Sequence, residues 1–232
     1  MRIGVAIFVA GLLGIGLFIP GDTLMALPKN EIARTPSYAG FAEINLTKNY
    51  FVIVSDTQST SHWEFWQERN KKERKLIIDE IVRREPAFVI HLGDLTTRGS
   101  SDKHWQIFDD FHVGFCQKKI PYFPILGDHE FYGNDMKALQ NYFDRFSHLD
   151  QRRWYSFTWK NVAFVMIDSN FSNLTKEQIA EQSQWYLSQL QSFERNEKID
   201  CIIVCCHEPS FTNSRVIKPN KNSGLYFADP FI

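Results

Sequence analysis

The segment YFVIVSDTQ, residues 50–58, joins a continuous apolar run to polar side chains at its carboxyl end. Val52, Ile53 and Val54 follow one another without alternation, which is typical of a strand buried on both faces. Asp56 and Gln58 come directly after this run. In open α/β sheets, the loops at the carboxyl ends of the strands converge on one crevice. The segment therefore predicts an α/β domain with a ligand site at one sheet edge.

The same pattern recurs along the chain. We predict strands over residues 50–55, 87–92, 121–126, 154–159, 162–167 and 200–206. Amphipathic stretches between them predict helices over residues 66–84, 102–118, 136–146 and 176–195. Because strands alternate with helices, we expect largely parallel sheets that helices cover.

The composition is that of a folded domain. The chain has 232 residues, of which 44% are hydrophobic, so intrinsic disorder is excluded. The net charge of -1 offers no basic surface for a polyanion, and nucleic acid is therefore not an expected partner. The sequence does not predict an oligomeric state.

The N-terminal segment has a different character. Residues 3–19 contain no charged side chain and follow the single basic residue Arg2. This arrangement is typical of an export signal, with a buried core helix as the alternative. We expect residues 1–26 to form a signal peptide or an N-terminal membrane anchor, residues 27–48 a linker, and residues 49–232 one domain. The protein would then be membrane-anchored, or secreted or periplasmic if the segment is cleaved.

Polar residues follow three further predicted strands. The second strand ends in Asp94, the third in Asp128, His129 and Glu130, and the last in His207. Taken singly, these aspartates could be turn or cap residues, and the histidine could be structural. Several carboxylates can share one crevice only where cations neutralise them. The set as a whole therefore predicts a metal site.

The order and spacing of these residues resemble the calcineurin-like metallophosphoesterase family. The family pattern runs D-x-H, G-D, G-N-H-D/E, H and finally G-H-x-H. The matching segments are Asp56-Thr57-Gln58, Gly93-Asp94, Gly127-Asp128-His129-Glu130 and His207. The resemblance implies a four-layer sandwich of two mixed β-sheets flanked by helices, with two divalent metal ions (Mn, Fe, Zn or Mg) at one edge.

The resemblance also implies a role for each matching residue. Asp56 and Gln58 would hold the first metal, and Asp94 would bridge both metals. Asp128 and His207 would hold the second metal.

The remaining site residues concern the reaction itself. In the implied reaction, a water that bridges the metals attacks a small-molecule phosphomonoester or phosphodiester. His129 would protonate the leaving oxygen or steady the transition state, with Glu130 as its orienting partner. Asn170 follows another predicted strand and is a candidate substrate contact on that position alone.

Three departures from the family pattern leave alternatives open. Gln58 stands where the pattern has histidine, Asp128 stands where it has asparagine, and no G-H-x-H follows His207. We therefore expect a second sheet that is truncated at the C-terminus. The alternative function is that of a degenerate, inactive fragment or a non-catalytic binding scaffold. An aspartyl-phosphate mechanism at Asp56 is disfavoured, because Gln58 takes the place of its second carboxylate.

Overall fold

The computed structural model describes residues 4–9, 35–59 and 71–208. Over these residues, seven strands form a three-stranded and a four-stranded sheet. The strands are β1 (Gly4–Val9), β2 (Val52–Val54), β3 (Val89–His91), β4 (Tyr122–Pro124), β5 (Tyr155–Trp159), β6 (Val162–Met166) and β7 (Cys201–Cys206). The α-helices are α1 (Lys71–Arg84), α2 (Asp102–Gln117), α3 (Asp135–Arg145) and α4 (Lys176–Glu194).

The two sheets differ in strand direction. The three-stranded sheet has the order β2-β3-β4 and is parallel throughout. The four-stranded sheet has the order β1-β7-β6-β5 and is mixed, because β5 and β6 form an antiparallel hairpin. The strands predicted from residue 50 onward and the described parts of the predicted helices are confirmed, with shorter bounds.

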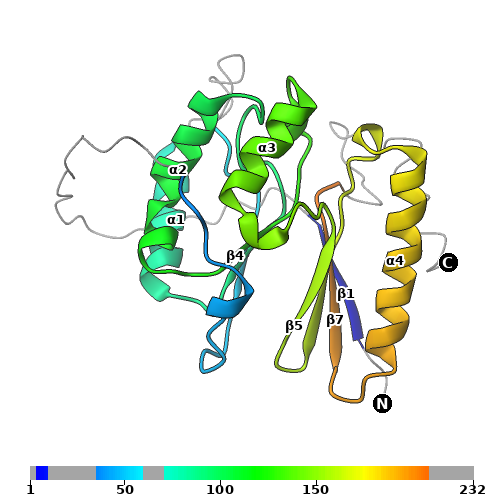
Figure 1. The fold of residues 1–232 in the computed structure, drawn as a ribbon. Helices are drawn as coiled ribbons and strands as arrows, with labels where there is room; N and C mark the ends of the chain where they lie inside the picture. Colours follow the sequence, from blue (N-terminus) through cyan, green and yellow to red (C-terminus); the bar gives the residue numbers. More distant parts are fainter. Residues whose placement is uncertain (1–3, 10–34, 60–70, 209–232) are drawn as a thin grey trace.

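Side chains of β6 show how the layers stack. Phe164 and Met166 lie in the core between the two sheets. Ala163 and Val165 point the other way and pack in a second cluster with Tyr186 of α4. Helix α4 therefore covers the outer face of the four-stranded sheet, while α1 and α2 cover the three-stranded sheet (Figure 1).

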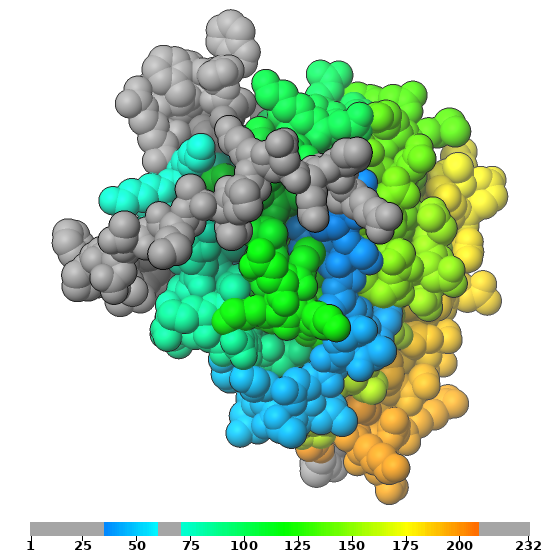
Figure 2. Space-filling view, turned by 60° about the vertical axis from the view of Figure 1, so that its left-hand side comes forward, coloured from blue at the N-terminus to red at the C-terminus, as the bar shows by residue number. Residues whose placement is uncertain are grey.

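Aromatic rings join the two sheets. The ring centroids of Phe123 in β4 and Phe157 in β5 are 4.5 Å apart. Phe157 in turn stacks on Phe164 of β6 at 4.8 Å. Figure 2 shows the outer side of the same arrangement, where residues 35–59 (blue) lie beside helices α1 and α2 (teal to green). These buried contacts fix the sheets relative to each other and so position the loops at their edges.

The N-terminal segment differs from the sequence prediction. We expected residues 1–26 to lie outside the fold, but residues 4–9 form β1, which pairs in parallel with β7 from Gly4 opposite Cys201 to Val9 opposite Cys206. The physical reason is that an apolar run rich in Val, Ile and Phe is a good strand former, and it covers an edge of β7.

The expected membrane anchor has no support in the described residues. Among them, no helix combines the length and apolarity needed to cross a membrane. Residues 10–26 lie outside the described part of the chain, so export of the protein stays a prediction.

Two buried histidines make the stability of the fold depend on pH. Burial lowers the pKa of His112 to about 3 and holds the pKa of His91 well below its usual value. In the unfolded chain, histidine titrates near 6.5, so the unfolded state binds more protons below that pH. These two histidines should therefore contribute a decrease in the free energy of unfolding as the pH falls below about 6.5, by up to about 1.4 kcal/mol per histidine and pH unit, and the raised pKa values of the buried Glu130 and Asp94 oppose this decrease.

Urea denaturation between about pH 7 and pH 5 measures this decrease. The ring Nδ1 of His112 donates to the carbonyl of Phe108 at 2.9 Å. In His112→Gln, the amide can still donate a hydrogen bond but cannot take up a proton. The free energy of unfolding of this variant should therefore decrease less steeply as the pH falls. A pH dependence that His112→Gln leaves unchanged would contradict the assignment.

Candidate metal centre

The loops that follow β2 and β3 are fastened to each other by their backbones. The N–H of Asp56 donates to the carbonyl of Gly93 at 3.2 Å, and the N–H of Gln58 donates to the carbonyl of Asp94 at 3.1 Å. Asp56 and Asp94 both have left-handed backbones, with φ of 57° and 58°. Aspartate tolerates this conformation better than most residues do. The sharp turns bring both aspartates to the same edge of the sheet.

Two glycines allow the ligand loops to approach closely. A Cβ atom on Gly127 would lie 2.3 Å from Oδ1 of Asp94. Gly93 has a φ of 87°, and a Cβ there would lie 2.7 Å from Nδ1 of His207. Any larger residue at either position would push the loops apart, so these glycines are required by the convergence of Asp94 and His207.

Three of the predicted ligands come together as expected. Ligand atoms of Asp94, Asp128 and His207 all lie within 4.8 Å of one another. Nε2 of His207 is 3.4 Å from Oδ1 of Asp94 and 3.5 Å from Oδ1 of Asp128. Nδ1 of His207 donates to the carbonyl of Leu92 at 2.7 Å, which leaves Nε2 to face the carboxylates. Two carboxylate oxygens and one imidazole nitrogen suit a divalent cation.

The electrostatics of this cluster favour positive charge at its centre. Burial, together with the charges of Asp128 and Asp56, raises the pKa of Asp94 to about 6, although His207 opposes this shift. Burial lowers the pKa of His207, but the hydrogen bond with Asp128 and the charge of Asp94 raise it to about 10. A divalent cation between these side chains would satisfy the same demand for positive charge.

The residues predicted for a first metal lie beside Asp94, but they are not arranged as a ligand pair. Oδ2 of Asp56 accepts a hydrogen bond from the hydroxyl of Ser55. Nε2 of Gln58 donates to Oδ2 of Asp94 at 3.0 Å, and Oε1 of Gln58 is buried without a hydrogen-bond partner. Over the described residues, the cluster of Asp94, Asp128 and His207 is the only group of three or more potential metal ligands of this kind.

His129 lies next to the ligands without joining them. Its ring Nδ1 is 3.0 Å from the carbonyl of Thr97, which can only accept, so Nδ1 carries the proton. Nε2 is 3.8 Å from Oδ2 of Asp94 and belongs to a side chain that is 24% exposed. The N–H of His129 donates to Oδ1 of Asp94 at 3.2 Å. This geometry leaves Nε2 free to exchange a proton with a molecule at the site.

Glu130 does not orient His129 as predicted. Its Oε2 accepts from the N–H groups of Gly127 at 2.7 Å and Asp94 at 2.8 Å, and its Oε1 accepts from the N–H of Thr96 at 3.1 Å. Burial, and then the charge of Asp94, raise the pKa of Glu130 to about 8. Glu130 is therefore a positioning residue that ties two ligand loops together from behind.

Glu130→Gln should weaken this tie. Whichever way the new amide is turned, its NH₂ group faces at least one backbone N–H, so a buried donor loses its acceptor. We expect the free energy of unfolding to decrease by about 1–3 kcal/mol and metal affinity to fall about 10- to 100-fold. Urea denaturation and calorimetric titration with Mn²⁺ measure the two effects. The exposed Glu181 on α4 offers a matched control in Glu181→Gln, and equal results for both variants would refute the role of Glu130.

The location of Asn170 argues against the predicted substrate contact. Asn170 is 2% exposed. Its Nδ2 donates to the carbonyl of Leu126 at 3.0 Å and to Oδ1 of Asp168 at 2.9 Å. The position of Asn170 after a strand suggested a role at the site. Its side chain instead holds its own loop against the segment that follows β4.

Tyr132 was missed in the sequence. Its hydroxyl donates to Oδ2 of Asp128 at 3.0 Å, and its ring centroid is 4.4 Å from that of His129. Tyr132 is 46% exposed, so its ring forms a solvent-facing wall of the site. The spacing of four residues from Asp128 was the available signal, because one helical turn brings such residues together.

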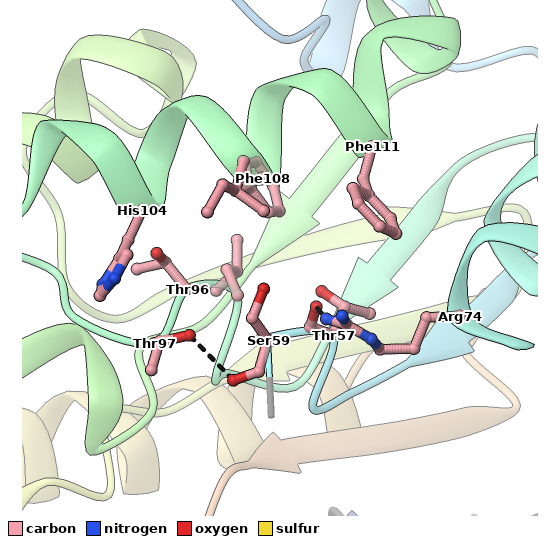
Figure 3. Close-up of a pocket in the computed structure, with 10 residues that line it drawn as sticks. Thr57, Ser59, Arg74, Thr96, Thr97, His104, Phe108 and Phe111 are labelled. Atoms are coloured by element: carbon pink, nitrogen blue, oxygen red, sulfur yellow. Dashed lines mark hydrogen bonds between the residues drawn. The ribbon is translucent and has the colours of Figure 1, made fainter. Parts of the chain in front are cut away.

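Arg74 of α1 supports the first ligand loop from behind. Its Nη1 donates to the carbonyl of Thr57 at 2.6 Å and also to the carbonyl of Gln58. Figure 3 shows Arg74 beside Thr57 at the edge of a small pocket, with Phe111 and His104 on the α2 side. This pocket lies behind the loop and contains none of the predicted ligand side chains.

Comparison with known proteins identifies the family. The sequence model of the calcineurin-like phosphoesterases matches residues 50–230. The chain belongs to the calcineurin-like phosphoesterase family. The resemblance inferred from the strand-end residues is thereby confirmed, and so is an α/β fold with two sheets flanked by helices.

A solved structure of another protein shows a similar fold. The structure of a purple acid phosphatase isolated from yellow lupin (Lupinus luteus) seeds is similar, with a TM-score of 0.53 and 20% sequence identity. The match covers 71% of this calcineurin-like chain and 31% of the lupin chain. The chain therefore spans less than a third of the length of that relative. No curated protein matches the sequence.

Proposed function

We propose that this chain is a metal-dependent phosphoesterase that hydrolyses a small-molecule phosphomonoester or phosphodiester. The observation that carries the proposal is the convergence of Asp94, Asp128 and His207 within 4.8 Å, beside His129. Carboxylate and imidazole ligands suit Mn, Fe, Zn or Mg. When bound, a divalent cation supplies charge neutralisation for the phosphate and lowers the pKa of water.

The chain's own residues supply the proton and the positioning. Because Nδ1 of His129 is held as a donor by Thr97, Nε2 is the ring atom that faces the site, and from the doubly protonated ring it would pass its proton to the leaving oxygen and leave a neutral imidazole. Oδ1 of Asp94 accepts the backbone N–H of His129, so the imidazole and the ligand cluster keep a fixed separation. Tyr132 holds Asp128 through its hydroxyl and offers an exposed ring against which substrate can lie.

A second candidate is a metal-binding scaffold without catalytic activity. The observation that favours it is the hydrogen bond from Gln58 to Asp94, which engages an oxygen that a second cation would need. In that case, the cluster would stabilise the fold or present a surface, and phosphoester hydrolysis would be absent.

Hydrolysis of two model substrates separates these candidates. The purified chain would be treated with a chelator and then supplied with Mn²⁺, Zn²⁺ or Mg²⁺, with p-nitrophenyl phosphate and bis(p-nitrophenyl) phosphate as substrates. The proposal expects hydrolysis of at least one substrate that the chelator abolishes and a metal restores. Metal binding to a folded chain without hydrolysis of either substrate would support the scaffold.

A further inference from the structure

We propose that this centre binds a single divalent cation, at Asp94, Asp128 and His207, and that the side-chain amide of Gln58 takes the place of a second cation beside Asp94. The inference rests on the proposed function, because it accepts these three residues as a metal site. It goes further in assigning the number of ions and a role for Gln58.

The two oxygens of Asp94 have different neighbours. Oδ1 lies 3.4 Å from Nε2 of His207, within the ligand cluster. Oδ2 accepts a hydrogen bond from Nε2 of Gln58 at 3.0 Å. A carboxylate that bridges two cations needs lone pairs directed at both. Here one lone pair of Oδ2 is directed at the side-chain NH₂ group of Gln58, which is not a metal ligand, whereas Oδ1 accepts from the backbone N–H of His129 and still lies beside Nε2 of His207.

The orientation of the Gln58 amide is the one that Asp94 selects. Turning the amide over would set Oε1 against Oδ2 of Asp94, two acceptors with no proton between them. The observed orientation leaves Oε1 buried and without a partner, and this cost is outweighed by the hydrogen bond to a charged group. The amide thus contributes partial positive charge where a cation would otherwise neutralise Asp94.

The backbone of Gln58 holds the side chain in place. Its N–H donates to the carbonyl of Asp94 at 3.1 Å, and its own carbonyl accepts from the guanidinium of Arg74. Arg74 is 9% exposed, so this support is part of the packed interior. For the amide to move away from Asp94, either these two backbone hydrogen bonds must break or the Gln58 side chain must rotate while its backbone stays in place.

In the described part of the chain, fewer donors remain on this side of Asp94. Among the described residues, Asp56 is the one remaining predicted ligand, and its Oδ2 accepts from Ser55. Catalytic zinc sites use three protein ligands, a number that the cluster of Asp94, Asp128 and His207 supplies. On the other side of Asp94, the described residues offer Asp56 and a neutral amide oxygen, which is a weaker set of donors than this cluster.

Binding of Mn²⁺ to the 232-residue chain tests the inference. We expect calorimetric titration to give one equivalent, and electron paramagnetic resonance to show the hyperfine pattern of an isolated ion. In Gln58→Glu, the donor to Asp94 is replaced by a carboxylate of the same shape. That variant should bind a second equivalent and show the exchange-coupled pattern of an ion pair. Gln184→Glu, which adds the same charge at an exposed position of α4, should stay at one equivalent.

Each contrary outcome has a distinct meaning. Two coupled ions in the unmodified chain would overturn the inference and leave the proposed function standing. A folded chain that binds no Mn²⁺ would overturn the proposed function and the inference with it. If Gln58→Glu is folded by circular dichroism and still binds one isolated ion, the role assigned to Gln58 is wrong.

Discussion

Replacing Asp94 with Asn is expected to remove metal binding and hydrolysis together. Asparagine keeps the shape of the side chain but loses the negative charge and replaces one oxygen by an NH₂ group. Asp94 contributes to the ligand cluster, accepts from Gln58 and accepts from the backbone of His129. Losing a residue that only supports a ligand costs about 10- to 100-fold in metal affinity, so losing the ligand itself should cost at least about 100-fold.

Loss of the ligand has to be distinguished from unfolding of the variant. Asp94 is 4% exposed, and burial, together with neighbouring acidic groups, raises its pKa to about 6. Asp94 also faces Nε2 of His207 at 3.4 Å, and removing one partner of a buried ion pair lowers the free energy of unfolding by about 3–5 kcal/mol, so the fold of the variant is measured separately from its metal affinity. Calorimetric titration with Mn²⁺ and hydrolysis assays measure the expected loss, while circular dichroism checks the fold. The surface residue Asp102 offers the control Asp102→Asn. Wild-type affinity in Asp94→Asn would refute the role of Asp94.

His129→Ala is expected to slow hydrolysis by about 10²- to 10⁴-fold while metal content stays the same. The imidazole lies beside the ligand cluster, with Nε2 3.8 Å from Oδ2 of Asp94, but it is not one of the converging ligands. Its removal therefore takes away a proton donor and leaves the carboxylates and His207 in place.

Substrates that differ in their leaving group distinguish proton transfer from a structural role. A good leaving group such as p-nitrophenolate departs without protonation, whereas an alkoxide requires a proton. The effect of His129→Ala should therefore be larger for an alkyl phosphate than for p-nitrophenyl phosphate. His104→Ala on α2 serves as a histidine control outside the ligand cluster. Loss of metal from His129→Ala, or an equal effect on both substrates, would contradict the assignment.

Much of the fold could be predicted because its signals are local. Continuous apolar runs such as residues 201–206 indicate a buried strand by themselves, and β7 has five buried residues and one half-buried residue. The convergence of Asp94 and Asp128 also follows from a general rule, since carboxyl ends of parallel strands meet at one edge, whereas His207 follows β7 of the other sheet and joins them through the packing of the two sheets.

Other features depend on partners that are remote in the sequence. The contact between Gln58 and Asp94 spans 36 positions, and nothing local indicates which end of the amide faces the carboxylate. Glu130 and Asn170 were placed at the site from their neighbours in the chain, but both side chains bond to buried backbone groups. For β1, an apolar run is compatible with a signal segment and with a strand, and only its pairing with β7 distinguishes them.

The central claim is that Asp94, Asp128 and His207 hold a divalent cation. Anomalous diffraction from crystals of the chain grown with Mn²⁺ or Zn²⁺ tests it most directly. The account predicts an anomalous peak within about 2.0–2.3 Å of Nε2 of His207 and of an oxygen of each aspartate. A well-ordered chain with no peak at these residues, or with its peak at other side chains, would contradict the account.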